Sequence, residues 1–318
     1  MKAFVTGGNG FLGAELVRQL RAAGHEATAA SRQTGVDILD PGGLRTAMAG
    51  HDIVFHVAAL AGVWGRASDF ERTNILGTEN IVQAMRELGI GRLVYTSSPS
   101  VVFDGGDQID ATSTLPYPER FLADYPRTKA VAERRVLAAN GPGLATVALR
   151  PHLIYGPGDP HLLPRLLARA RAGRLRVVGS GENRVSLSFV ENAAAAHHQA
   201  ALALTGPQSP PAGRAFFVND PGPVRLWDWL NGLFGQLGVA PVTRRVPAGV
   251  AYGAGAVAEA VWRLLGLSGE PPMTRFVALQ LATHHTYSLA EAQQAFDYRP
   301  PVGPEEALAR TVASLRTA

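Results

Sequence analysis

The sequence predicts an α/β protein with a parallel sheet, helices on both of its faces, and a smaller, mostly helical cap. In the first half, short apolar runs alternate with longer amphipathic ones, a pattern typical of parallel sheets. After Arg150 the pattern changes to loops rich in proline and glycine, short strands and several helices. We expect a sheet domain over residues 1–150, to which later segments return, and mainly the cap over residues 151–318.

The expected elements can be placed along the chain from these runs. The expected strands of the first half are residues 2–6, 27–30, 53–57, 93–96 and 145–149. The expected helices between them are residues 11–24, 70–89 and 126–140. Two of the short strands expected after residue 150 are residues 175–178 and 216–218.

Composition narrows the classes of function. A chain of 318 residues that is 46% hydrophobic can bury a large core. Because it has no cysteine, disulfides, thiolate metal sites and a cysteine nucleophile are excluded, and we expect a cytoplasmic protein. The net charge is +4, but the arginines are scattered without a basic stripe, which argues against a nucleic-acid partner.

A glycine-rich turn joins the first strand to the first helix. Gly7, Gly10 and Gly13 have the spacing that permits a tight turn, close approach of a pyrophosphate, and close packing of helix on strand. The helix N-terminus adds free N–H groups and a positive dipole end. We therefore expect a Rossmann-type doubly wound fold that binds a dinucleotide through these glycines, Phe11 and Leu12.

The residues after the second strand indicate which dinucleotide is bound. An NAD-selective site usually has an acidic residue here for the ribose hydroxyls, whereas this chain has Ser31 and Arg32. A guanidinium and a hydroxyl suit a 2′-phosphate, so the sequence favours NADP(H) over NAD(H). Asp37 and Ile38 are candidates for the adenine pocket, although Asp37 also suits a loop or cap position.

Three residues in order along the chain suggest proton transfer. Ser98 ends a buried strand, and Tyr125 and Lys129 lie four residues apart at the head of a helix. We expect the ammonium to lower the pKa of the phenol, Tyr125 to pass a proton to a carbonyl oxygen, and Ser98 to hydrogen-bond that oxygen. Asn74 is a candidate for a proton relay. Each of these residue types also has ordinary structural uses.

The low lysine content of the chain supports a chemical role for Lys129. Of the thirty basic residues, only Lys2 and Lys129 are lysines. Arginine does not lose its proton near neutral pH, and its planar fork does not replace a compact donor.

These motifs resemble the extended short-chain dehydrogenase/reductase superfamily. The resemblance covers nearly the whole chain and rests on TGGNGFLG at 6–13, HVAA at 56–59, the YxxxK pair and LRPxxIYGPGD at 149–159. It implies that Tyr125 and Lys129 also contact the cofactor. It further implies cofactor contacts at Ala58, Ala59, Pro151, Leu153 and Ile154.

Within that superfamily the chain is similar to the 3β-hydroxysteroid dehydrogenase branch, through YTSSPSVVF at 95–103 and RTNILGTENIVQA at 72–84. RPHLIYGPGDPHLLPR at 150–165 and GEPPMTRF at 269–276 resemble the 2-alkyl-3-oxoalkanoate reductases of bacterial long-chain olefin biosynthesis. That resemblance implies NADPH-dependent reduction of an apolar 2-alkyl-3-oxo acid. It also implies assembly with the β-lactone synthetase and decarboxylase of the same pathway. Members of the superfamily commonly dimerise, and helices 70–89 and 126–140 are the candidates for that contact.

The substrate site is less defined. Ser98, Ser100, His152 and His161 are candidate substrate contacts, and a histidine or Arg165 could receive a carboxylate. The polar segment 104–124 is a candidate lid. The apolar segment 248–267 contains only Glu259 and Arg263 as charged residues; we expect a buried or lid helix, with a membrane-surface helix as the alternative.

Other readings remain open. A hydroxysteroid or sterol-carboxylate dehydrogenase would use the same three residues on a rigid ring. A sugar-nucleotide epimerase shares the fold, and a protein that binds NADP(H) to sense it or to assemble partners needs no turnover. The adjacent pairs His197-His198 and His284-His285 lack a carboxylate cluster, so we expect no metal site.

Overall fold

The structure is a computed structural model that describes residues 1–160 and 162–317. Its centre is a parallel six-stranded sheet in the order β11-β6-β4-β3-β1-β2. The strands are β1 Lys2–Thr6, β2 Glu26–Ala30, β3 Ile53–His56, β4 Arg92–Thr96, β6 Ala145–Pro151 and β11 Arg214–Val218. The order reverses between β1 and β3, the place where open α/β sheets bind ligands.

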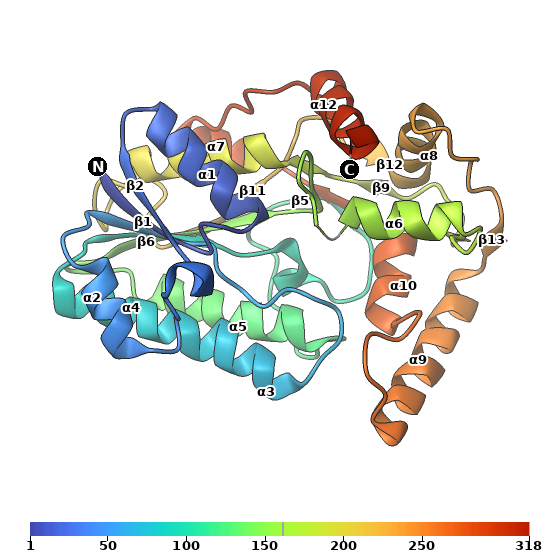
Figure 1. Cartoon of the computed structure of the whole chain (residues 1–318), viewed down its shortest axis with the longest axis horizontal. Coiled ribbons are helices and arrows are strands. Elements are labelled where there is room, and N and C mark those ends of the chain that lie inside the picture. Colours follow the sequence, from blue (N-terminus) through green and yellow to red (C-terminus); the bar gives the residue numbers. More distant parts are fainter. Residues whose placement is uncertain (161, 318) are drawn as a thin grey trace.

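Helices cover both faces of this sheet, and alternating residues of each strand face the two layers (Figure 1). One layer is α1 Phe11–Ala22, α7 Val190–Ala203 and α11 Ala290–Phe296. The other is α2 Pro41–Met48, α4 Gly77–Leu88 and α5 Asp124–Ala138. Along β1, Ala3 and Val5 face the first layer and Phe4 faces the second. The expected doubly wound sheet is therefore confirmed.

The remaining elements form the cap beside the carboxyl edge of the sheet (Figure 1). Its helices are α6 Leu162–Arg171, α8 Leu226–Gln236, α9 Ala248–Leu265, α10 Arg275–Ala282 and α12 Pro304–Thr317. Its short strands are β7 Ile154–Tyr155, β8 Val177–Val178, β9 Arg184–Val185, β10 Ser188–Phe189, β12 Val224–Arg225, β13 Arg245–Val246 and β14 His285–Tyr287; β14 also pairs with β5 Gln108–Ala111. These elements share a second apolar core around Trp227, Leu230 and Phe234.

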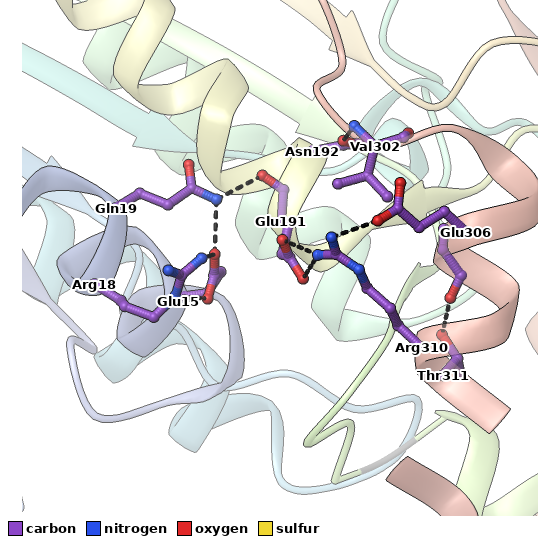
Figure 2. A network of polar contacts seen from close by, with 10 residues as sticks. Glu15, Arg18, Gln19, Glu191, Asn192, Val302, Glu306, Arg310 and Thr311 are labelled. Atoms are coloured by element: carbon purple, nitrogen blue, oxygen red, sulfur yellow. Dashed lines mark hydrogen bonds and ion pairs between the residues drawn. The ribbon is translucent and has the colours of Figure 1, made fainter. Parts of the chain in front are cut away.

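A polar network joins the cap to the sheet (Figure 2). Arg310 of α12 donates to both carboxylate oxygens of Glu191 on α7 and to Glu306. Next to Glu191, the buried Asn192 accepts from the Val302 N–H and donates to the Val302 carbonyl and to Asp220. Because Asp220 also accepts from the Tyr155 hydroxyl, the network holds β7 in place.

Two elements differ from the expectation. Helix α2 was not predicted; it begins with Pro41 in its first turn and with Asp40 accepting from the Gly42 N–H. The predicted helix 70–89 is divided into α3 Ala67–Phe70, a π-helical turn Glu71–Leu76 and α4. π-helical turns occur frequently at functional sites, and this one contains Asn74.

Segment 248–267 forms the expected helix, but of the alternatives predicted for it, a helix buried in the core is wrong. Helix α9 buries only Ala251, Gly255 and Glu259. None of the helices in the described part of the chain is long and apolar enough to cross a membrane.

Candidate active site

The glycine turn has no room for side chains at its third glycine. The Gly10 N–H donates to the Gly7 carbonyl, and a Cβ at Gly13 would lie 2.1 Å from that same oxygen. Gly7 has a φ of +67°, which favours glycine. The Leu12 side chain is buried in the core, so Leu12 offers a ligand its main-chain N–H, whereas the Phe11 side chain is only partly buried.

A cavity of about 510 Å³ opens beside this turn. Of the predicted cofactor contacts, those that line it are Gly7, Ser31, Arg32, Asp37, Ile38, Ala58 and Ala59. The cavity therefore brings together the ends of β1, β2 and β3. Its wall also contains residues that we did not predict, namely Thr6, Ala30, Val36, Leu39, Leu60, Asp69, Arg72 and Thr73. Arg72 is the most informative of these, because it adds a second guanidinium to the cavity.

The two residues after β2 differ in their surroundings. Ser31 caps a short 3₁₀ turn by accepting from the Gln33 N–H, and its hydroxyl donates to the side chain of Asn9, 2.8 Å away. Arg32 is exposed. Asp37 is used partly within its own loop, where its carboxylate accepts from the Leu39 N–H.

The predicted proton-transfer residues meet at the carboxyl edge of the sheet. Ser98 follows β4, Tyr125 lies in the first turn of α5, and Lys129 lies one turn further along. The Ser98 hydroxyl is 2.9 Å from that of Ser100 and accepts from the Ser100 N–H, and it is close enough to Tyr125 to lower the pKa of the phenol. Ser100 is buried and holds this hydroxyl in place.

The expected pKa of the tyrosine is wrong in direction. Burial raises the pKa of Tyr125, and the nearby Ser98 hydroxyl offsets this only in part. The ammonium of Lys129 donates instead to the Thr96 carbonyl at 2.5 Å and lies 4.1 Å from the centre of the Tyr95 ring. Burial lowers the pKa of Lys129 to about 7. In this state Tyr125 holds its proton firmly and Lys129 is close to releasing one.

Asn74 is buried beside this cluster but bonds elsewhere. Its amide donates to the Leu60 carbonyl and to the Thr128 hydroxyl, each at 3.1 Å, and accepts from the Leu60 N–H at 2.8 Å. These bonds tie the loop after β3 to α5. Asn74 therefore positions the helix that carries Tyr125 and Lys129.

The segment after β6 passes the catalytic edge in an unusual conformation. Pro151 ends β6, and Ile154 begins β7, which pairs with Ser188. Between them Leu153 has a φ of +45°, in the left-handed region that a leucine rarely adopts. Strained residues of this kind cluster at active sites and ligand clamps.

The residues that we predicted to bind a substrate carboxylate are placed less favourably for that role. The ring of His152 is buried between His285 and Tyr287, with Nδ1 2.7 Å from the Ser186 carbonyl. Burial lowers the pKa of His152 to about 4, so the ring is neutral near pH 7 and fits packing better than carboxylate binding. Arg165 forms an ion pair with Glu270. His161 lies outside the described residues.

The paired histidines have separate partners. His197 lies between Thr96 and the Ala193 carbonyl, and His285 contacts Thr283. Within residues 1–160 and 162–317, no three His, Asp or Glu side chains are grouped as metal ligands.

The parallel sheet, the glycine turn and the Ser98–Tyr125–Lys129 cluster together define an extended short-chain dehydrogenase/reductase. Residues 25–247 match the 3-beta hydroxysteroid dehydrogenase/isomerase family, and the chain belongs to this family. It is therefore an oxidoreductase.

Curated relatives and solved structures agree with this assignment. The chain is 46% identical to a 2-alkyl-3-oxoalkanoate reductase of Stenotrophomonas maltophilia, with 99% of each chain covered. It is 34% identical to the decarboxylating sterol-4-alpha-carboxylate 3-dehydrogenase of Mus musculus, covering 98% of this chain and 90% of that protein. Among solved structures, MoeE5 in complex with UDP-glucose and NAD superposes with a TM-score of 0.76 at 25% identity, covering 100% of this chain and 99% of that one.

Proposed function

We propose that the protein reduces a long-chain 2-alkyl-3-oxoalkanoic acid to the 2-alkyl-3-hydroxyalkanoic acid with NADPH. The observation that carries the reaction type is the cluster of Ser98, Tyr125 and Lys129 at the carboxyl edge of the sheet, the edge at which the cavity beside Gly7 also opens. The relative from Stenotrophomonas maltophilia supports the substrate class, since it is named for that reduction and matches over 99% of the chain.

The residues around the cavity fit a dinucleotide. A pyrophosphate needs close approach to the main chain, which Gly7, Gly10 and Gly13 provide because a Cβ at Gly13 has no room. The adenosine end would lie against Asp37, Ile38, Ala58 and Ala59, and the nicotinamide end against Lys129 and segment 151–154. When bound, the cofactor supplies the hydride.

Arg32 supports NADPH as the preferred form. Its side chain is exposed at the cavity wall, and no carboxylate replaces it after β2. Arg72 lines the same cavity and is a second candidate for the 2′-phosphate.

The protein's own residues would carry the proton. Tyr125 keeps its proton because burial raises the pKa of its phenol, which suits a donor to the carbonyl oxygen. The Ser98 hydroxyl lies near the Tyr125 phenol and lowers its pKa, so both groups can converge on that oxygen as negative charge develops. Lys129 uses one of its three donors on Thr96 and keeps the others for the cofactor ribose and for replacing the proton that Tyr125 gives up.

The wider organisation is part of the same proposal. Residues 1–150 would bind NADP(H) together with later segments that rejoin the sheet, and residues 151–318 would mainly enclose an apolar keto acid. We propose a homodimer through α4 and α5, which pack side by side on one face of the sheet. Assembly with a β-lactone synthetase and a decarboxylase would consume the product. We propose a cytoplasmic enzyme that works at the periphery of a membrane.

A second candidate is oxidation of a sterol 4-carboxylate or a 3β-hydroxysteroid. The relative from Mus musculus favours it, at 34% identity over 98% of the chain. In both reactions the reacting oxygen would lie against Ser98 and Tyr125. The two substrates differ in shape, and therefore in the space that the cap must provide.

The test is NADPH oxidation, followed by absorbance, with purified protein and a long-chain 2-alkyl-3-oxo acid. Parallel reactions use NADH in place of NADPH and a 3-ketosteroid in place of the oxo acid. We expect oxidation with the oxo acid and NADPH. Turnover of the steroid alone would move the assignment to the second candidate, and cofactor binding without any turnover would favour a sensing or assembly protein.

A further inference from the structure

Helix α9 has one face that packs and one that does not. Its packed face lies against α10, where a Cβ at Gly255 would be 2.6 Å from the main chain of Thr274. On that face Glu259 accepts from both the main-chain N–H and the guanidinium of Arg275. These contacts, together with Tyr252, which packs against the apolar core of the cap, fix the helix through a face that leaves most of its valines and leucines free.

The large apolar side chains of α9 point into solvent. Their spacing of three, four and seven residues places them on one stripe of the helix, which we call the α9 stripe. The stripe, with the exposed fraction of each residue, is Val250 58%, Val257 65%, Val261 37%, Leu264 84% and Leu265 68%; Leu267 follows the helix at 42%. Few other large apolar residues in the described chain are as exposed, and those are isolated on other elements, as with Ile109 and Leu202.

The charges around the stripe that lack an ion pair have one sign. In residues 237–270 the charged side chains are Arg244, Arg245, Glu259, Arg263 and Glu270. Glu259 is buried in its ion pair with Arg275, and Glu270 forms an ion pair with Arg165, so within the described residues the charges of this segment that lack an ion pair are the three arginines. An apolar stripe flanked by arginines, with the nearby carboxylates held in ion pairs, is the pattern of helices that lie in the surface of an anionic bilayer.

The position of α9 in the molecule suits such a surface. In Figure 1 the helix, in orange, extends below the rest of the cap, and its C-terminal end with Leu264 and Leu265 is the outermost part. Beneath it lies a cavity of about 290 Å³ lined by Glu259 and Arg263 on one side and by Trp64, Leu122 and Asp124 on the other. Asp124 immediately precedes Tyr125, so this cavity lies between α9 and the start of the catalytic helix.

We propose that the α9 stripe docks the protein on anionic lipid. The valines and leucines of the stripe enter the boundary between head groups and acyl chains, and Arg244, Arg245 and Arg263 contact the phosphates. A second copy of the chain fits the surface less well, because pairing two stripes would bring their arginines into one interface, while the nearby carboxylates Glu259 and Glu270 are already held in ion pairs. The docking itself does not depend on the substrate; delivery of an apolar substrate through the underlying cavity rests on the proposed function.

The experiment is co-sedimentation of the full chain with vesicles, without substrate or cofactor. One set of vesicles mixes phosphatidylglycerol with phosphatidylcholine, and the other is pure phosphatidylcholine. We expect binding to the anionic set that weakens with salt. Leu264→Ser with Leu265→Ser should weaken it at least about tenfold, since two exposed leucines no longer enter the bilayer. Arg263→Glu should weaken it at least about fivefold on anionic vesicles.

Ile109→Ser with Leu202→Ser is the matched control, because these residues are comparably exposed on other elements. This variant should bind like the wild type, and circular dichroism should show all variants folded. Two outcomes would overturn the proposal: wild-type protein that ignores both kinds of vesicle, or equal binding by the leucine variant. If the leucine variant instead lowers the mass of an oligomer in analytical ultracentrifugation and leaves vesicle binding unchanged, the stripe is a contact between copies. Because vesicle binding needs no turnover, its failure is separate from any failure of the reductase assay.

Discussion

The two ends of the proposed cofactor site differ in how much water surrounds their side chains. At the catalytic end Lys129 is only 2% exposed, and burial shifts the pKa values of both Lys129 and Tyr125. At the adenosine end Arg32 is exposed and Ser31 bonds mainly within its own turn. Electrostatic effects grow as water is removed. We therefore expect substitutions at the catalytic end to cause large losses of activity or stability, and substitutions at the adenosine end to change the preference for NADPH over NADH.

Tyr125→Phe should have the largest effect. We expect kcat to fall about 10³-fold, within the range for loss of a general acid, because Ser98 remains but has no phenol to supply the proton. NADPH affinity, measured by fluorescence titration, should be nearly unchanged. Tyr252→Phe on α9 is the matched control and should keep full activity. Normal turnover by the Tyr125 variant would remove the assignment.

Gly13→Ala tests the turn between the two ends. Its Cβ would lie 2.1 Å from the Gly7 carbonyl oxygen, so the turn must open, and we expect a loss of about 3 kcal/mol in stability together with weaker NADPH binding. The control is Gly232→Ala in α8, where a Cβ meets nothing within 4 Å, and the helix should gain up to about 1 kcal/mol. Urea denaturation measures both. Equal stability of the two variants would show that the turn tolerates a side chain.

Lys129→Met tests burial at the catalytic end through the pH dependence of folding stability. The pKa of Lys129 is about 7 in the folded chain against 10.5 for an ordinary lysine in water, so between these values the unfolded chain binds more protons. Wild-type stability should therefore rise with pH from 7 towards 10, by at most about 1.4 kcal/mol per pH unit from this group.

The methionine variant should lack that slope, so any stability advantage that it has at pH 7 should shrink by pH 9. Urea denaturation of the protein without cofactor at pH 7, 8 and 9 checks this. Lys2, the other lysine, is exposed, and Lys2→Met should keep the wild-type slope. If stability changed with pH in the same way in the wild type and in Lys129→Met, the pKa of Lys129 would not be lowered.

Arg32→Asp should have the smallest effect. Since the guanidinium is exposed, we expect the ratio of kcat/KM for NADPH over NADH to fall about tenfold, equivalent to about 1.4 kcal/mol. Arg72→Ala is the informative partner variant. An unchanged ratio in Arg32→Asp with a reduced ratio in Arg72→Ala would place the phosphate at Arg72.

Local patterns predicted the strands of the first half and most of its helices, but not α2. The glycine turn and the Tyr125–Lys129 spacing depend on neighbouring residues, so the sequence predicts both correctly. Arg72 was missed because its approach to the cavity depends on the π-helical turn over Glu71–Leu76, which no short motif marks.

Burial was the property that the sequence predicted worst. Spacing suggested that Lys129 would lower the pKa of Tyr125, but that inference took no account of desolvation of both groups. Apolar composition likewise suggested that α9 is buried. In the structure, α10 packs only against the face of α9 around Gly255. Composition does not show which apolar residues find partners within the chain.

The path of the chain between sheet and cap restricts how the molecule can move. After β6 the chain enters the cap, returns through α7 to β11, enters the cap again, and returns through α11 before ending in α12. A body attached by one linker can swing as a rigid hinge, whereas one attached by several crossings and by the Arg310–Glu191 pair resists rotation. Exchange of ligands should therefore depend on movements of single loops, such as segment 104–124, rather than on opening of the two halves.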